Sequence, residues 1–419
     1  MLHEIVLATG CTEPVAVALA ATKSRETLGE MPDSIEIFLS KNVFKNAMGV
    51  GIPGTGMIGL PIAVAMGITE GASDRNLEVL NILPRQVENA KLWLEQNSGR
   101  INIHVKDTTE KLYIECVCRK GSDSATAVIA QRHTNFVRIE RNGHVLLENS
   151  QTEADTQTDN AGDGIQLSAR KVFEFATMTP LEELEFINET VKYDMAVSDA
   201  GLSGNYGLTA GKVLMEQADG DIVHTTVSKT VAASDARMAG CSNPVFSNSG
   251  SGNQGITCTI PVYEFGTLNK YPHETITRGL IMSHLMSIYI KRGIGRLSAL
   301  CGIVNASLGV TSGLTYMQGG SYEQVTFALK NLINTLTGMV CDGAKPSCAL
   351  KVATGVYSAF VASKLAMHTK VVDETDGLSE QDIDRTISNL GKLGKDAMNE
   401  TDEMILEIMT NKQHREKDK

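Results

Sequence analysis

The sequence predicts an α+β fold, in which an N-terminal part with α/β and antiparallel β-rich character precedes a mainly helical C-terminal part that shares the active site. Three observations support this prediction. Runs of β-branched residues separated by short turns fill the stretch from about 77 to 150. Helix-length segments dominate after residue 166, and an almost wholly polar stretch precedes them. The expected regions are residues 1–76, 77–165 and 166–419.

Residues 1–76 form a Gly/Ala-rich segment that we expect to carry the first candidate ligand. It should begin with a short helix, the turn GCTEP at 10–14 and a helix over VAVALAATKSRETLG at 15–29. The alternating SIEIFLS at 34–40 is typical of a half-buried strand. The glycine-rich KNAMGVGIPGTG at 45–56 follows it.

The β-rich region contains runs with strand character, separated by the turn residues KGSDS and RNG, which indicates a mostly antiparallel sheet. The runs are INIHVKD (101–107), KLYIECVCRK (111–120), ATAVIAQRHTNFVRIE (125–140) and HVLLEN (144–149). Cys116 and Cys118 point to one face of their strand, so we interpret both as core residues. Residues 150–163 contain almost nothing apolar and should form an exposed loop or flexible linker.

The C-terminal region should be mainly helical. Segments with helical character cover 180–197, 205–218, 272–291, 322–340 and 347–369, and an amphipathic helix or two covers 378–410. We find no repeat of solenoid length.

The composition favours a globular protein with a small-molecule substrate. Hydrophobic residues make up 42% of the 419 positions, and 38 Lys and Arg against 49 Asp and Glu give a net charge of −11. Because the acidic residues are spread along the chain, we expect no nucleic acid and no membrane partner. No apolar run reaches the roughly 20 residues of a membrane span, and the N-terminal residues lack the features of a signal peptide. We therefore expect a cytoplasmic protein.

The eight cysteines need an explanation, because disulfides are rare in a reducing cytosol. The zinc-site spacings Cys-x-x-Cys and His-Glu-x-x-His do not occur. Cys11, Cys301 and Cys341 each lie at a predicted helix break with a glycine within two residues. Such a glycine lets the backbone approach a bulky inorganic cluster and direct amides at its sulfurs. The pattern favours a set of three cluster ligands drawn from distant parts of the chain.

Two further cysteines are ambiguous at this stage. Cys241 lies in GCSNP at 240–244, which echoes GCTEP, so local pattern alone makes it a candidate fourth ligand. Cys348 follows Pro346 in a predicted helix, where core packing is the plainer interpretation. Cys258, in an apolar run, is also interpreted as core.

The loop GVGIPG at 49–54 matches the dinucleotide fingerprint Gly-x-Gly-x-x-Gly, but its context is wrong for that function. About nine residues separate it from the preceding strand, and Pro53 removes an amide. A tight glycine turn that packs near another segment is the better interpretation.

The loop SNSGSGNQG at 247–255 gathers hydroxyl and amide groups that suit an anion such as a carboxylate. We expect the strand-like ITCTIPV at 256–262 to anchor it. The loop also resembles the substrate-carboxylate loop of pyridoxal-phosphate dehydratases, with Lys229 upstream. Against that alternative, the chain offers only Gly319-Gly320 as a phosphate cradle.

Taken together, six ordered motifs closely resemble the L-cysteine desulfidase family, which is related to the catalytic chain of the bacterial iron-sulfur L-serine dehydratases. The motifs are GCTEP (10–14), KNAMGVGIPGTG (45–56), HTN (133–135), SNSGSGNQG (247–255), LCGIVNASLG (300–309) and MVCDGAKPSC (339–348). The resemblance implies a 4Fe-4S cluster held by Cys11, Cys301 and Cys341, with one iron left open. Cys241 is not a ligand position of that family, which argues against a fourth thiolate there.

The resemblance further implies β-elimination of L-cysteine to hydrogen sulfide, ammonia and pyruvate. Ser249, Asn253 and Gln254 would hold the substrate carboxylate. Asn46 and Thr134 would lie near the amino end or the reacting face.

The catalytic base stays open between Lys345 and His133. L-serine dehydration at the same cluster is the nearest alternative, followed by a pyridoxal-phosphate eliminase and a non-catalytic small-molecule-binding protein. The sequence leaves the oligomeric state open, and a homodimer is compatible with it.

Overall fold

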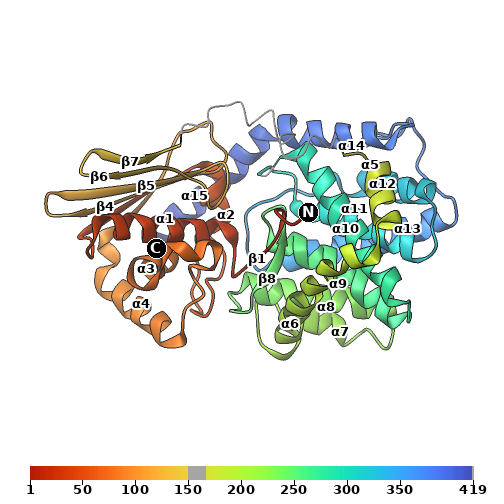
Figure 1. Cartoon of the computed structure of the whole chain (residues 1–419), viewed down its shortest axis with the longest axis horizontal. Coiled ribbons are helices and arrows are strands. Elements are labelled where there is room, and N and C mark those ends of the chain that lie inside the picture. The colour runs from red at the N-terminus through yellow and green to blue at the C-terminus, as the bar shows by residue number, and fades with distance from the viewer. Residues whose placement is uncertain (150–166, 296, 418–419) are drawn as a thin grey trace.

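The computed structural model describes residues 1–149, 167–295 and 297–417. A part built on a β-sheet and a part built of helices lie side by side (Figure 1). The predicted α+β fold, with a mainly helical C-terminal part, is therefore confirmed. The linker expected at 150–163 lies outside the described residues.

The N-terminal part contains a six-stranded sheet in the order β3-β2-β4-β5-β6-β7, antiparallel except for the β2–β3 pair. Its strands are β2 (Ser34–Leu39), β3 (Ile101–Val105), β4 (Tyr113–Lys120), β5 (Asp123–Ala130), β6 (Phe136–Arg141) and β7 (His144–Glu148). Each lies in or overlaps a run with predicted strand character, but the single run expected over 125–140 is divided into β5 and β6 by a turn at 131–135. Because β2 is hydrogen-bonded to both β3 and β4, the first 76 residues and the β-rich region share one sheet.

Helix α1 (Thr12–Leu28) packs on β4 and β5, and α3 (Leu60–Glu70) packs on α1. The small residues of both helices allow a close approach: a Cβ at Gly67 would meet the Ala18 carbonyl oxygen at 2.4 Å. Helix α4 (Pro84–Asn97) covers α3 and was not predicted, because the strands around it dominate the pattern of that region.

The C-terminal part is a helical bundle around α11 (Gly302–Met317), which contacts four neighbouring helices and is buried along most of its length. The bundle also contains α5 (Ala169–Met178), α6 (Asn188–Ser203), α8 (Ile222–Met238), α9 (Gly252–Leu268), α10 (His273–Ile294), α12 (Tyr322–Leu336) and α13 (Cys348–Met367). The helices predicted at 272–291, 322–340 and 347–369 are present with shifted ends. The segment 205–218 contains only the short α7 (Ala210–Met215), and 180–197 begins with 3₁₀ turns before α6.

Two predicted elements near the candidate site are wrong. The short helix expected before GCTEP is instead the strand β1 (Ile5–Ala8), because β8 (Val245–Asn248) supplies it with an antiparallel partner. The strand expected over 256–262 lies inside α9. Ser251 caps that helix by accepting from the Gln254 amide, and burial of its first eleven residues removes the polar face that would mark a helix in the sequence.

The chain returns to the N-terminal part at its end. Helix α14 (Ile383–Lys392) packs on α10, a π-helical turn follows at Leu393–Ala397, and α15 (Asn399–Lys417) contacts α2 (Lys41–Ala47) (Figure 1). Within the described ranges, no helix is both long enough and apolar enough to cross a membrane.

Candidate functional site

A cavity of about 120 Å³ is lined by residues of both parts of the molecule. Its wall comes from segments that are far apart in the sequence, including the starts of α1 and α11 and the loop before α13. Among the predicted site residues, it brings together Cys11, Cys301, Cys341, Asn46, His133, Ser249, Asn253 and Gln254.

The three candidate cysteine ligands reach this cavity from helix starts and one loop. Cys11 directly precedes α1, and Cys301 directly precedes α11. Cys341 is held next to Cys301 because the two loops pair: the Cys301 amide donates to the Met339 carbonyl at 3.0 Å, and the Cys341 amide donates to the Ala299 carbonyl at 2.6 Å. Residues forty positions apart are thus fixed side by side by backbone hydrogen bonds.

A fourth thiol lies at the same cavity. Cys348 begins α13 and lines the wall, whereas the sequence placed it in the core. Its Sγ lies 3.7 Å from the Gly343 carbonyl oxygen. Cys241, the other ambiguous cysteine, is buried in a separate apolar cluster with Val197 and Ile256 and is not part of the described wall.

The charges at the wall suit a negatively charged occupant. Burial raises the pKa of the Cys11 and Cys301 thiols to about 12, and the Arg237 guanidinium opposes this rise at Cys11. Arg237 and Lys291 line the cavity with only 5% and 6% of their surface exposed. Thiolates bound to a metal group would complement these two positive charges.

The thiols of this wall are the type of ligand that iron-sulfur clusters use. Across the described residues, no three His, Cys, Asp or Glu side chains converge closely enough to bind one ion. In a cluster the protein thiolates bind several iron atoms, so the sulfurs need only surround a common space. Four thiols around one cavity, with two buried cations, meet that requirement.

Two amide side chains are oriented as hydrogen-bond donors toward the cavity. Asn253 Oδ1 accepts from Arg237 Nη1 at 3.1 Å, and Gln254 Oε1 accepts from Asn305 Nδ2 at 2.7 Å. With both oxygens engaged, the NH₂ groups are left for an acceptor in the cavity. Gln254 lies so close to Gly302 that a Cβ there would meet Gln254 Nε2 at 2.8 Å.

Glu13, which was not predicted from the sequence as a site residue, lies at the centre of another polar group. Its carboxylate accepts from Thr12 Oγ1 at 3.0 Å and from Asn46 Nδ2 at 3.1 Å, and its Oε1 lies 3.9 Å from His133 Nε2. Burial alone would raise the pKa of Glu13, but His133 and the Thr12 hydroxyl lower it to about 2, so the carboxylate is ionised. An acidic residue in the first turn of a helix, two positions after a candidate ligand, was the available signal.

Three lysine and threonine candidates lie elsewhere. Thr134 is exposed, and neither it nor Lys345 is part of the described wall. Lys345 Nζ lies 2.8 Å from an Asp342 carboxylate oxygen and 3.2 Å from the Gly343 carbonyl oxygen. Lys229, on which a pyridoxal-phosphate site would depend, is paired with Glu264 at 2.8 Å, also outside the described wall.

The glycine-rich loop 49–54 packs against the turn around Cys241. The Gly51 amide donates to the Met238 carbonyl and the Gly54 amide to the Gly240 carbonyl, both at 2.9 Å. A Cβ at Gly51 would lie 2.3 Å from the Ala239 carbonyl carbon. The glycines therefore serve a close backbone contact near Cys11, where Pro53 also meets Gly10.

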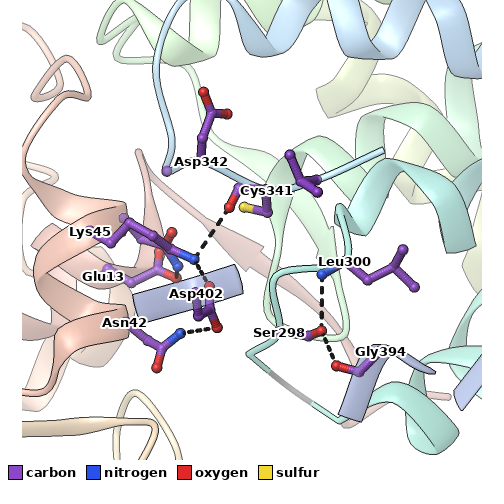
Figure 2. A network of polar contacts seen from close by, with 12 residues as sticks. Glu13, Asn42, Lys45, Ser298, Leu300, Cys341, Asp342, Gly394 and Asp402 are labelled. Carbon is purple, nitrogen blue, oxygen red and sulfur yellow. Dashed lines mark hydrogen bonds and ion pairs between the residues drawn. The ribbon is translucent and has the colours of Figure 1, made fainter. Parts of the chain in front are cut away.

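A polar network connects α15 to the cavity loops (Figure 2). Lys45 donates to the Cys341 carbonyl at 3.3 Å and forms an ion pair with Asp402 of α15, and Asp402 also accepts from Asn42 Nδ2 at 2.8 Å. Ser298 Oγ, in the loop before Cys301, donates to the Gly394 carbonyl. The C-terminal segment thus contacts α2 and the loop before Cys301, and it is linked to the Cys341 loop through Lys45.

The chain is similar to proteins of a known family. Residues 74–407 match the family model described as serine dehydratase alpha chain. A UPF0597 protein of Bacteroides thetaiotaomicron is 50% identical over 416 residues, which cover 98% of this chain and 96% of the relative. UPF0597 proteins of Porphyromonas gingivalis and Aeromonas hydrophila subsp. hydrophila are 46% and 42% identical, over 98% of this chain and 96% and 95% of the relatives. The names of these relatives state no activity.

Proposed function

Because this chain belongs to the serine dehydratase alpha chain family, we propose that it is an iron-sulfur-dependent lyase that acts as an L-cysteine desulfidase. One observation carries the proposal. Cys11, Cys301 and Cys341 converge on a single cavity whose wall also offers amide donors for a carboxylate. A metal group and a small organic acid can therefore be held next to each other.

Cys11, Cys301 and Cys341 would hold a 4Fe-4S cluster, and Arg237 and Lys291 would balance its negative charge. When bound, the cluster supplies a Lewis-acidic iron that polarises the bond between the β-carbon and the leaving sulfur. The burial of Cys11, Cys301 and the two cations keeps water away from the reacting atoms.

The side chains of the wall would hold the substrate and move its proton. Asn253 and Gln254 donate to the carboxylate of L-cysteine. His133 takes the proton from Cα, and that electron pair forms the Cα–Cβ double bond while the Cβ–S bond breaks. Sulfide leaves with the bonding electrons, and the remaining 2-aminoacrylate tautomerises and reacts with one water to give pyruvate and ammonia. No oxidant or reductant is consumed.

His133 suits the role of base better than Lys345. Its Nε2 is buried without a hydrogen-bond partner among the described residues, and the ionised Glu13 lies 3.9 Å away. Glu13 would orient the ring and stabilise the imidazolium that forms when the proton is taken. Lys345 is instead engaged by Asp342 and is not part of the described wall.

L-serine dehydration is the second candidate, and the description of the matching family model favours it. The same residues would hold L-serine, with water as the leaving group in place of sulfide. A pyridoxal-phosphate mechanism has less support, because Lys229 is engaged by Glu264. A non-catalytic binding protein would bind the amino acid without releasing sulfide or pyruvate.

Parallel anaerobic assays separate these candidates. We expect L-cysteine to yield sulfide and pyruvate in equal amounts, faster than L-serine yields pyruvate. Lys229→Ala should retain this activity, and His133→Ala should lose most of it, about 10²-fold or more. Faster turnover of L-serine would assign the dehydratase activity, and no product from either amino acid would overturn the proposal.

A further inference from the structure

A hydrogen-bond network behind the cavity fixes the direction in which Ser249 can donate. Asn248 is fully buried, and its Nδ2 donates to the His284 backbone carbonyl at 3.1 Å. A carbonyl oxygen can only accept, so this contact identifies the NH₂ group of Asn248. The Oδ1 of Asn248 therefore faces Ser249 Oγ, which lies 2.9 Å away.

The proton of the Ser249 hydroxyl is consequently committed to Asn248. The amide oxygen can only accept, so Ser249 Oγ must donate to it. Turning the hydroxyl toward the cavity would leave a buried oxygen without a hydrogen bond, which is costly. What Ser249 presents to the cavity is a pair of acceptor lone pairs.

The residues behind Asn248 hold this arrangement in place. Asn248 Nδ2 also lies 3.2 Å from His284 Nδ1, which must then accept, so His284 carries its proton on Nε2 and donates to Thr259 Oγ1 at 3.0 Å. Ser249 itself is fixed by its backbone, with a φ of 50° and an amide that donates to the Glu4 carbonyl at 2.9 Å. Neither the Ser249 hydroxyl nor the Asn248 side-chain amide can turn round without breaking these hydrogen bonds.

The cavity thus offers donors and an acceptor at different places. Asn253 and Gln254 present NH₂ groups, whereas Ser249 presents lone pairs, and Glu13 adds a negative charge to the same wall. A free α-amino acid has the complementary pair of groups, a carboxylate that accepts and an ammonium that donates.

We propose that Ser249 accepts a hydrogen bond from the α-ammonium group of the substrate and so restricts the site to free α-amino acids. This differs from the sequence-based expectation, which placed Ser249 at the carboxylate. The inference rests on the proposed function, because it concerns how that amino acid is held.

The test uses two thiols that each keep one end of L-cysteine. Cysteamine has the amine and no carboxylate, and 3-mercaptopropionate has the carboxylate and no amine. Their inhibition constants are measured anaerobically with the iron-loaded protein. Ser249→Ala should raise the inhibition constant of cysteamine about tenfold, since a hydrogen bond to a charged group is lost. It should change the inhibition constant of 3-mercaptopropionate less than about twofold.

Two further variants make the result specific. Ser249→Gly also lacks the hydroxyl and accommodates the φ of 50°, so it should repeat the effect if Ser249→Ala folds poorly. Ser247 lies in β8, just before Ser249, and its hydroxyl donates to the Val6 carbonyl outside the described wall. Ser247→Ala should therefore leave both inhibition constants unchanged.

The outcomes separate this inference from the proposed function. Ser249 does not bind the ammonium group if Ser249→Ala and Ser249→Gly weaken the binding of 3-mercaptopropionate as much as that of cysteamine. The same holds if both variants leave the inhibition constant of cysteamine unchanged. If wild-type protein binds neither thiol and does not turn over L-cysteine, the proposed function fails, and this inference fails with it.

Discussion

The charged side chains at the cavity form two groups. Arg237 and Lys291 place positive charge on the wall that carries the cysteines, and the Glu13 carboxylate lies with Asn46 and His133. An amino acid held beside a metal cluster would complement both groups, since the cluster thiolates carry negative charge and the α-ammonium group carries positive charge.

At the residue scale, the contact between Gly302 and Gln254 predicts a defect in substrate binding. In Gly302→Ala the new methyl group would displace Gln254, which a Cβ would meet at 2.8 Å. We expect the KM for L-cysteine to rise about tenfold with iron content preserved, because a donor to the carboxylate is lost. Gly338→Ala is the control, since a Cβ there meets nothing within 4 Å. An unchanged KM in Gly302→Ala would contradict this account of Gln254.

Asp194 predicts a pH-dependent stability. It is fully buried in α6 and accepts from the Phe246 amide at 2.9 Å, and burial raises its pKa to about 7 from an ordinary value near 4. The pKa of Asp194 is higher in the folded protein than in the unfolded chain. Its contribution to the free energy of unfolding is therefore fully present below about pH 4 and is lost as the pH rises through about 7.

The variant Asp194→Asn isolates this contribution. We expect the Tm of the wild type to fall relative to that of the variant by a few degrees between pH 5 and pH 8, because other titrating groups cancel in the comparison. Parallel curves for the two proteins would show that Asp194 is not protonated in the folded state.

Local signals account for which site residues could be predicted. Glycine neighbours and helix breaks pointed to Cys11, Cys301 and Cys341, and the structure brings these three together. Arg237 gave no such signal, because its partners are Asn253 and the Gly10 carbonyl, which meet it only after folding. Lys345 is the converse case, since nearness in sequence to Cys341 did not bring it to the cavity.

At the scale of elements, α15 determines how α2 meets the cysteine loops. Lys45 of α2 is 2% exposed and contacts both Asp402 of α15 and the Cys341 carbonyl (Figure 2). The loop after Cys341 packs directly on α2, since a Cβ at Gly343 would lie 2.4 Å from the Lys45 carbonyl oxygen. The position of Cys341 therefore depends on α2 and α15 together.

This arrangement predicts that Asp402→Ala destabilises the protein. The change leaves the Lys45 ammonium buried without its carboxylate, which typically costs about 3–5 kcal/mol. We expect the free energy of unfolding measured in urea to fall by that amount. We also expect a lower iron content after anaerobic purification.

The neighbouring residue Glu403 supplies the control for that prediction. It lies on the same helix, and its ion pair with Lys41 is exposed, so Glu403→Ala should change stability by less than about 1 kcal/mol. Equal effects of the two changes would mean that the buried contact to Lys45 does not hold α15.

Elements were predictable where their pattern was clear. Strand β2 alternates between buried and half-buried positions, and the sequence showed it. The start of α9 is apolar and β-branched with no exposed face, so a strand and a buried helix look alike there. For β1, the partner strand β8 decided the outcome, and no window of local sequence contains both.

At the scale of the whole molecule, neither part carries a complete site. The N-terminal part contributes Cys11, Glu13 and His133, and the helical part contributes Cys301 and Cys341. The fold class could be predicted because strands and helices occupy separate stretches of the chain. The arrangement of the two parts could not, because it depends on the β1–β8 pair and on the contacts of α15.

The central claim, that three cysteines from both parts hold a cluster required for elimination, has a direct test. The measurement is sulfide release from L-cysteine by anaerobically purified protein of known iron content. We predict a brown protein with about four iron and four acid-labile sulfide atoms per chain, and loss of iron and activity in Cys301→Ala. Cys241→Ala, outside the described wall, should keep both. An iron-free preparation that still releases sulfide, or a Cys301→Ala variant that keeps its iron and its activity, would contradict the claim.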